Sequence, residues 1–166
     1  MVFDRLTKVA LILVLSAAGL FGANSPDKTR PVKWMRGIYI AESPVAQPMP
    51  EDLIWSIADA RARKVKGTTL QGHGRSMMPF YQPGTVLVIA PVKFDDLRRG
   101  QTVVYYNEGS RPVAHVLVAK CKTAWRVAGL NNTSHDLEGV TAQNLFGVVV
   151  EAFHPVETST QVASLR

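Results

Sequence analysis

The spacing of apolar residues divides this chain of 166 residues into three parts. The run from Val9 to Ala23 is apolar except for one serine, residues 51–66 have helical spacing, and from residue 67 onward short apolar runs alternate with turns. A hydrophobic run, a 3.6-residue period and short runs bounded by turn residues are typical of a membrane segment, an amphipathic helix and β-strands. The pattern therefore predicts these three kinds of structure in that order.

The amino-terminal segment has the order of a signal peptide or an anchor. Residues 1–8 carry two basic residues and precede the apolar run, as in targeting segments. The possible cleavage sites are poor, because a cut after Ala23 has bulky Phe21 where a small residue is preferred, and a cut after Ala18 leaves a short apolar core. We therefore expect an uncleaved membrane anchor over residues 9–24, in contact with membrane lipid.

Residues 25–50 contain five prolines and no sustained period, which predicts a linker. Pro50 then begins a helix over residues 51–66, with acidic residues in its first turn and basic residues in its last, as the helix dipole favours. One stripe of the helix predicts a face that packs on the domain or lies on a bilayer. The stripe consists of Leu53, Ile54, Ile57, Ala58 and Arg61.

The remainder of the chain reads as a β domain over residues 67–154, followed by a flexible tail over residues 155–166. Several of the runs are apolar on both faces, which suggests strands that pack between layers or coil on themselves. The fold class is therefore predicted to be all-β. Strands are expected at residues 85–90, 102–106, 112–119, 124–128 and 145–152.

Composition narrows the range of partners. The chain is 46% hydrophobic and 19% charged, with a net charge of +6. Its basic residues cluster at 28–36, 61–66 and 98–99 without interleaved aromatic residues, which favours an anionic membrane surface over nucleic acid. Cys121 is the single cysteine, so no internal disulfide can form and no zinc motif is present. We expect no metal, no cofactor and no nucleic-acid partner.

One short segment has the composition of a nucleophile turn. In Gly74-Arg75-Ser76-Met77-Met78-Pro79, the glycine allows close backbone approach and the proline stiffens the chain after the serine. A serine hydroxyl needs a base before it can act as a nucleophile. His115 is the candidate, because it is the histidine that lies within a predicted strand of otherwise apolar residues.

Five motifs in order resemble the type I signal peptidases, and most closely their Ser–His branch. They are Ser76-Met77-Met78-Pro79, Pro83-Gly84, Gly100 before Val103-Val104-Tyr105, His115, and Gly129-Leu130-Asn131-Asn132 ending at Asp136. Asn144-Leu145-Phe146-Gly147-Val148-Val149 is similar to the closing strand of that family. The resemblance extends from Gly72 to Phe153.

The resemblance implies a fold, a reaction and a location. The fold would be a coiled β-sheet catalytic domain like that of signal peptidases and LexA, preceded by the membrane helix and the short amphipathic helix. Its activity would be the cleavage of signal peptides from membrane-delivered preproteins that carry small residues before the cut. The protein would cross the cell membrane once, with its catalytic domain on the extracytoplasmic side.

The resemblance also implies roles for single residues. Ser76 would be the nucleophile, His115 its general base and Asp136 the carboxylate that orients the imidazole. The Ser76 N–H would donate to the oxyanion. The residues implied to bind substrate are Gly74, Met77, Met78 and Pro79.

The chain departs from the family pattern in its charged residues. Thr85, Gln101 and Leu130 stand where the family usually has aspartate after glycine, and Val116 replaces the arginine after the base. In the family that arginine pairs with the aspartate that Leu130 replaces. Both partners of the pair are therefore apolar here, and such a joint replacement is often neutral for stability.

Two other functions are consistent with the sequence. A LexA-like Ser–Lys peptidase would use Lys120 or Lys122, although strand alternation without a bulge places these lysines on the face opposite to that of His115. A catalytically inactive or specialised paralogue would bind extended peptides without cutting them. Whether Ser76 and His115 lie within hydrogen-bond reach of each other is the feature that separates these alternatives.

Overall fold

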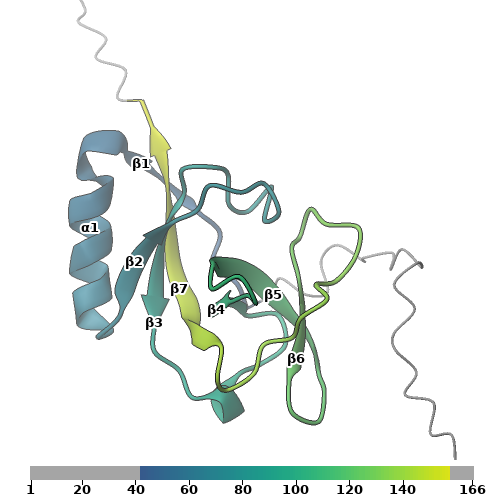
Figure 1. The fold of residues 1–166 in the computed structure, drawn as a ribbon. Coiled ribbons are helices and arrows are strands. Elements are labelled where there is room, and N and C mark those ends of the chain that lie inside the picture. The colour runs from purple at the N-terminus through teal and green to yellow at the C-terminus, as the bar shows by residue number, and fades with distance from the viewer. Residues whose placement is uncertain (1–41, 158–166) are drawn as a thin grey trace, which may run out of the picture. The chain divides into compact units, whose positions relative to one another are not determined.

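The computed structural model describes residues 42–157, in which one α-helix packs against a seven-stranded sheet (Figure 1). The predicted basic segment at 1–8 and the predicted anchor at 9–24 lie outside the described residues, as do most of the linker and of the tail. Among residues 42–157, no helix is both long enough and apolar enough to cross a membrane.

The regular structure of residues 42–157 consists of seven strands, one α-helix and a short 3₁₀ helix, so the predicted all-β class is confirmed. The sheet has the order β2-β3-β7-β4-β5-β6, with antiparallel neighbours, and β1 pairs parallel to β7. The elements are β1 (Gln47–Pro50), α1 (Glu51–Lys64), β2 (Thr68–Gln71), β3 (Val86–Ala90), the 3₁₀ helix η1 (Phe94–Asp96), β4 (Thr102–Tyr106), β5 (Pro112–Lys120), β6 (Trp125–Ala128) and β7 (Leu145–Val156).

Strand β7 pairs with three other strands along its length. Its extent and its pairing with β1 differ from two predictions, the end of the β domain at residue 154 and the linker over residues 25–50. It runs to Val156, past the predicted end of the domain at residue 154, and its last residues pair with β1. Strand β1 lies within residues 25–50, where only a linker was expected. The prolines of this segment argued against a strand. Among the described strands, however, β1 pairs with β7 only. An edge strand tolerates proline because the backbone on its outer side forms no hydrogen bonds with another strand.

Helix α1 ends at Lys64, two residues before the predicted end. Lys66 has φ +53, and its N–H and that of Gly67 donate to the carbonyls of Arg63 and Ala62, which is a Schellman closure. Gly67 is required for a different reason: a Cβ at this position would lie 1.9 Å from the carbonyl oxygen of Ile89.

The prediction of which α1 residues form the apolar face is only partly correct. Ile54 and Ala58 are buried, together with Ala62, and pack on β3 and β7. Leu53 is 46% exposed and does not belong to the packed face. The buried residues follow an i, i+4, i+8 spacing, so the contact is a narrow line down the helix.

Strand β3 is apolar on both faces because layers cover both of them, as the sequence pattern predicted. Val86 and Val88 pack under α1. Leu87 and Ile89 face the opposite way into a cluster that includes Met77, next to the proposed nucleophile. Figure 1 shows α1 beside β2 and β3, with β7 running between β3 and β4.

Val116 and Leu130, the two positions that the resemblance matches to an ion pair, belong to one packed region. Val116 is 1% exposed within the core cluster that contains Met77, and Leu130 packs against the same cluster. Val116 lies opposite Ala128 in the β5–β6 register, and Leu130 follows Ala128 by two residues, in the turn after β6. The two side chains therefore pack on the same core cluster.

This packing predicts strong coupling between two charge substitutions. Val116→Arg or Leu130→Asp alone should destabilise the domain by about 3–5 kcal/mol, because each buries a charge without a partner. The double variant should lose less than the sum of the two, because the charges can pair. Denaturant unfolding of the wild type, both single variants and the double variant measures the coupling. Additive losses would show that the two positions do not meet.

Candidate active site

Ser76 lies in a tight turn between β2 and β3, and this turn is fixed in place because the next residue, Met77, is buried in the core. The Met78 N–H donates to the Arg75 carbonyl at 3.2 Å, and the Tyr81 N–H donates to the Met77 carbonyl at 3.1 Å. The Met77 side chain is only 4% exposed and is packed in the core. Burial of Met77 fixes the turn, while Ser76 itself stays partly exposed.

His115 lies within hydrogen-bond reach of Ser76, as the sequence predicted. Its ring is carried by the middle of β5, is 6% exposed, and has Nε2 2.9 Å from Ser76 Oγ. The two residues are 39 positions apart in the chain. The sheet brings them together, because β5 is held between β4 and β6.

Asp136 completes a chain of three side chains. Its Oδ2 lies 2.5 Å from His115 Nδ1. Because a carboxylate only accepts hydrogen bonds, we assign the ring proton to Nδ1, which leaves Nε2 to accept from the Ser76 hydroxyl. This is the tautomer that a general base requires.

The loop after β6 connects the serine turn to the aspartate. The Asn131 N–H donates to the Ser76 carbonyl at 2.7 Å, and the Asp136 N–H donates to the Val127 carbonyl at 2.9 Å. Gly129 lies so close to the serine that a Cβ there would be 2.7 Å from the Ser76 carbonyl oxygen and 2.8 Å from Ser76 Cβ. Contacts below 3.0 Å require displacement, so this position accepts glycine alone without movement.

A backbone donor is available beside the hydroxyl. Among the described residues, no hydrogen bond engages the N–H of Ser76. Gly74, two residues earlier, has open space on its side-chain side, since a Cβ there would meet only Ser76 Oγ, at 3.9 Å. The site therefore presents one unengaged N–H and an unfilled position where a further donor could be accommodated.

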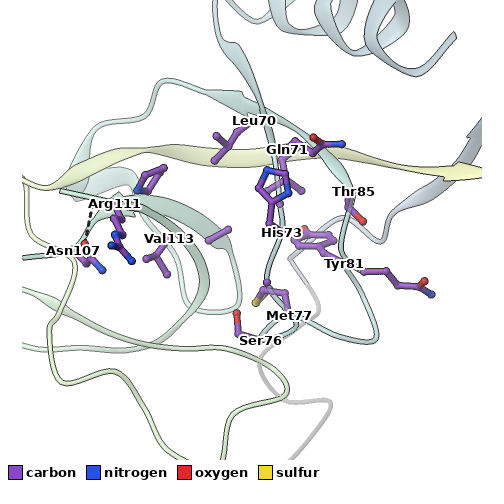
Figure 2. Close-up of a pocket in the computed structure, with 16 residues that line it drawn as sticks. Leu70, Gln71, His73, Ser76, Met77, Tyr81, Thr85, Asn107, Arg111 and Val113 are labelled. Atoms are coloured by element: carbon purple, nitrogen blue, oxygen red, sulfur yellow. Dashed lines mark hydrogen bonds between the residues drawn. The ribbon is translucent and has the colours of Figure 1, made fainter. Parts of the chain in front are cut away.

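A cleft of about 600 Å³ borders the serine. Figure 2 shows Ser76 beside Met77 at its border, with Val113 and Arg111 on one side and Tyr81 and Thr85 on the other. Of the four residues expected to bind substrate, Gly74 and Met77 line the cleft, whereas Met78 and Pro79 do not. The reason is the tight turn after Ser76, which directs the chain at Met78 and Pro79 away from the cleft.

The cleft lining is mostly apolar and carries no acidic side chain. Leu70 and Gln71 of β2 and Pro112, Val113 and Ala114 of β5 form parts of its walls. Strand β2 is at the end of the sheet order and pairs with β3 alone. An extended peptide could therefore be bordered by the backbone of both strands in this cleft.

The two lysines of the Ser–Lys alternative do not contact Ser76. Lys120 is at the exposed end of β5, where its Nζ lies 6.0 Å from the centre of the Trp125 ring. Lys122 is exposed in the turn that follows. The β5–β6 register shifts between Leu117 and Ala119, so the simple alternation expected for the strand does not extend to its end.

One polar residue of the site was missed by the sequence analysis. The hydroxyl of Tyr105 on β4 donates to Asp136 Oδ2, the same atom that His115 contacts. Burial, then the hydrogen bond with Asp136 and the charges of Asp136 and Glu138, raise the pKa of Tyr105 well above its ordinary value. The hydroxyl therefore stays protonated and acts as a donor. In the sequence Tyr105 is one of several aromatic strand residues, and nothing distinguishes it there.

No protein-family model, curated protein or solved structure matches this chain. The site itself combines a serine hydroxyl, a histidine hydrogen-bonded to that hydroxyl, a carboxylate hydrogen-bonded to the histidine, an unengaged N–H and an adjoining cleft.

The close approach at Gly129 predicts the effect of adding one methyl group. Gly129→Ala should displace Ser76 from His115 and lower activity by about a hundredfold, the loss expected when a reacting group moves by about 1 Å. Gly109→Ala is the matched control, because a Cβ there meets only Asn107 Oδ1, at 3.4 Å. The rate of hydrolysis of an activated ester or peptide is the measurement. Wild-type activity in Gly129→Ala would contradict the proposed contact.

Proposed function

We propose that this protein is a membrane-anchored serine endopeptidase that cleaves preproteins, resembling the Ser–His branch of the type I signal peptidases. The observation that carries the proposal is the hydrogen-bonded series Ser76, His115 and Asp136 at the border of a cleft. The mostly β architecture is consistent with the coiled catalytic sheet of that family. The cleft supports a peptide substrate rather than a small metabolite, because strands border it on two sides.

Catalysis would begin with acylation of the serine. As Ser76 Oγ attacks the scissile carbonyl carbon, its proton passes to His115 Nε2, 2.9 Å away. The imidazolium that forms is stabilised by Asp136 at Nδ1. The Ser76 N–H is the donor available to the oxyanion. His115 then protonates the leaving amine, and the peptide bond breaks.

Deacylation would reverse these roles with water. The freed His115 Nε2 takes a proton from a water molecule that attacks the acyl carbon, and returns that proton to Ser76 Oγ as the ester bond breaks. The apolar walls of the cleft would hold the acyl part of the peptide in place while water enters from the leaving-group side.

A peptide-binding module without activity is the second candidate, because β2 borders the cleft and, among the described strands, pairs on one side only. In that case a peptide would add to the strand and remain intact. The Ser–Lys alternative has less support, since the base within reach of Ser76 is His115. The two main candidates differ in whether Ser76 is reactive.

Substitution of the two central residues tests the proposed enzyme. Ser76→Ala and His115→Ala should each reduce cleavage of a preprotein by the full chain by on the order of 10⁴-fold or more, as loss of a triad member does elsewhere. Lys120→Ala and Lys122→Ala serve as controls and should retain activity. A serine-directed phosphonate inhibitor should label the wild type and not Ser76→Ala. Binding of intact peptide without labelling of Ser76 would favour the peptide-binding module.

The proposed base also predicts the form of the pH dependence. Protonated imidazole cannot accept the serine proton, so kcat/KM should fall with decreasing pH as the base becomes protonated. A lysine base would place this limb at higher pH. The measurement is a pH–rate profile of the wild type and of Lys120→Ala. A limb well above neutral pH that moves in Lys120→Ala would contradict the assignment of His115.

A further inference from the structure

The aspartate of the site has a second partner that the proposed mechanism does not use. Tyr105 is 2% exposed, and its hydroxyl donates to Asp136 Oδ2. The same oxygen lies 2.5 Å from His115 Nδ1. One carboxylate oxygen therefore accepts from both the imidazole and the phenol.

The sheet itself brings the phenol to this oxygen. Val103 lies opposite His115 in the β4–β5 register, and Tyr105 follows two residues later on the same face as Val103. The register between β4 and β7 shifts between Val104 and Tyr105, where Val104 pairs with Gly147 and Tyr105 with Leu145. The additional residue of this bulge lies on β7, so the alternation of β4 continues through Tyr105.

We propose that Tyr105 is a positioning residue that holds the Asp136 carboxylate in the orientation required by His115 and limits the negative charge that the imidazole experiences. The expected effect of Tyr105 on the reaction rate rests on the proposed function. Its expected effect on the protonation of His115 does not, because that effect exists whether or not Ser76 is catalytic. The phenol donates to the carboxylate and so withdraws part of its charge from the imidazole. Without this bond the carboxylate would turn more freely and attract the imidazolium more strongly.

Other titratable groups lie near this arrangement. Glu138 accepts from the backbone N–H of Glu108, and His135 Nδ1 lies 3.0 Å from the Asp136 carbonyl oxygen. Besides His115, the titratable or charged groups on β4, β5, β6, the serine turn and the loop after β6 are His73, Arg75, Tyr105, Tyr106, Lys120, Arg126, His135, Asp136 and Glu138. The Asp136 carboxylate accepts a hydrogen bond from the Tyr105 hydroxyl and another from His115.

The test is an NMR titration of the His115 ring in the full chain, with its signal assigned by its absence in His115→Ala. In Tyr105→Phe the midpoint of the His115 titration should move to higher pH. In the same variant the acid limb of kcat/KM should move in the same direction, and kcat/KM at its plateau should fall about tenfold, as loss of one ordinary hydrogen bond produces. An unchanged His115 midpoint would overturn the proposal.

Two controls separate this role from a structural one. Thr102→Val removes another buried hydroxyl of β4, one that lies 2.8 Å from Ser43 Oγ and does not contact Asp136, so it should leave the His115 midpoint unchanged. Tyr106→Phe alters the exposed neighbour, whose ring packs edge-on against Phe146, and should leave both the midpoint and the activity unchanged. A midpoint shift in Thr102→Val equal to that in Tyr105→Phe would overturn the proposal.

A double-mutant comparison keeps the test valid if Tyr105→Phe is destabilised. In the Asp136→Asn background the carboxylate is absent, so adding Tyr105→Phe should no longer change the His115 midpoint. A shift that persists without the carboxylate would overturn the proposal. Failure of the proposed function has a different signature: Ser76 in the wild type would not react with a phosphonate inhibitor, while Tyr105→Phe would still shift the His115 midpoint.

Discussion

Backbone contact between the serine turn and the loop after β6 is the constraint on which the site depends. The Asn131 N–H reaches the Ser76 carbonyl at 2.7 Å, and Gly129 allows this approach because it has no Cβ. The same loop returns to β6 through the Asp136 N–H. The position of the hydroxyl and that of the carboxylate are thus determined by one short loop, and His115 on β5 lies between them.

The core supports this loop from beneath. Met77 is buried next to Ser76 in a cluster that also contains Val116 and Leu87, and Leu130 packs against that cluster just after Gly129. Val116 and Leu130 therefore belong to the support of the site and not to its reactive groups. Apolar packing can fill this place because neither residue leaves a charge without a partner.

Asp136 illustrates how a polar group is used at a partly buried site. Its side chain is 16% exposed and accepts from two donors, His115 and Tyr105. A carboxylate removed from water needs such donors to compensate for lost hydration. Two donors on one oxygen also restrict its rotation, which links the orientation of the imidazole to a strand, β4, that contributes no reactive atom.

The sequence by itself determined the fold class, the approximate strands and the pairing of Ser76 with His115. The fold class and the strands follow from local rules, namely apolar periodicity and turn residues, whereas the pairing of Ser76 with His115 was expected from the resemblance to the type I signal peptidases. The tertiary structure decided the rest. Strand β1 and the end of β7 form because they pair with each other. The sequence did not predict them, because both segments contain proline. Tyr105 acquires its role only because the β4–β5 register places it on the face of His115, and a single sequence does not specify register between strands.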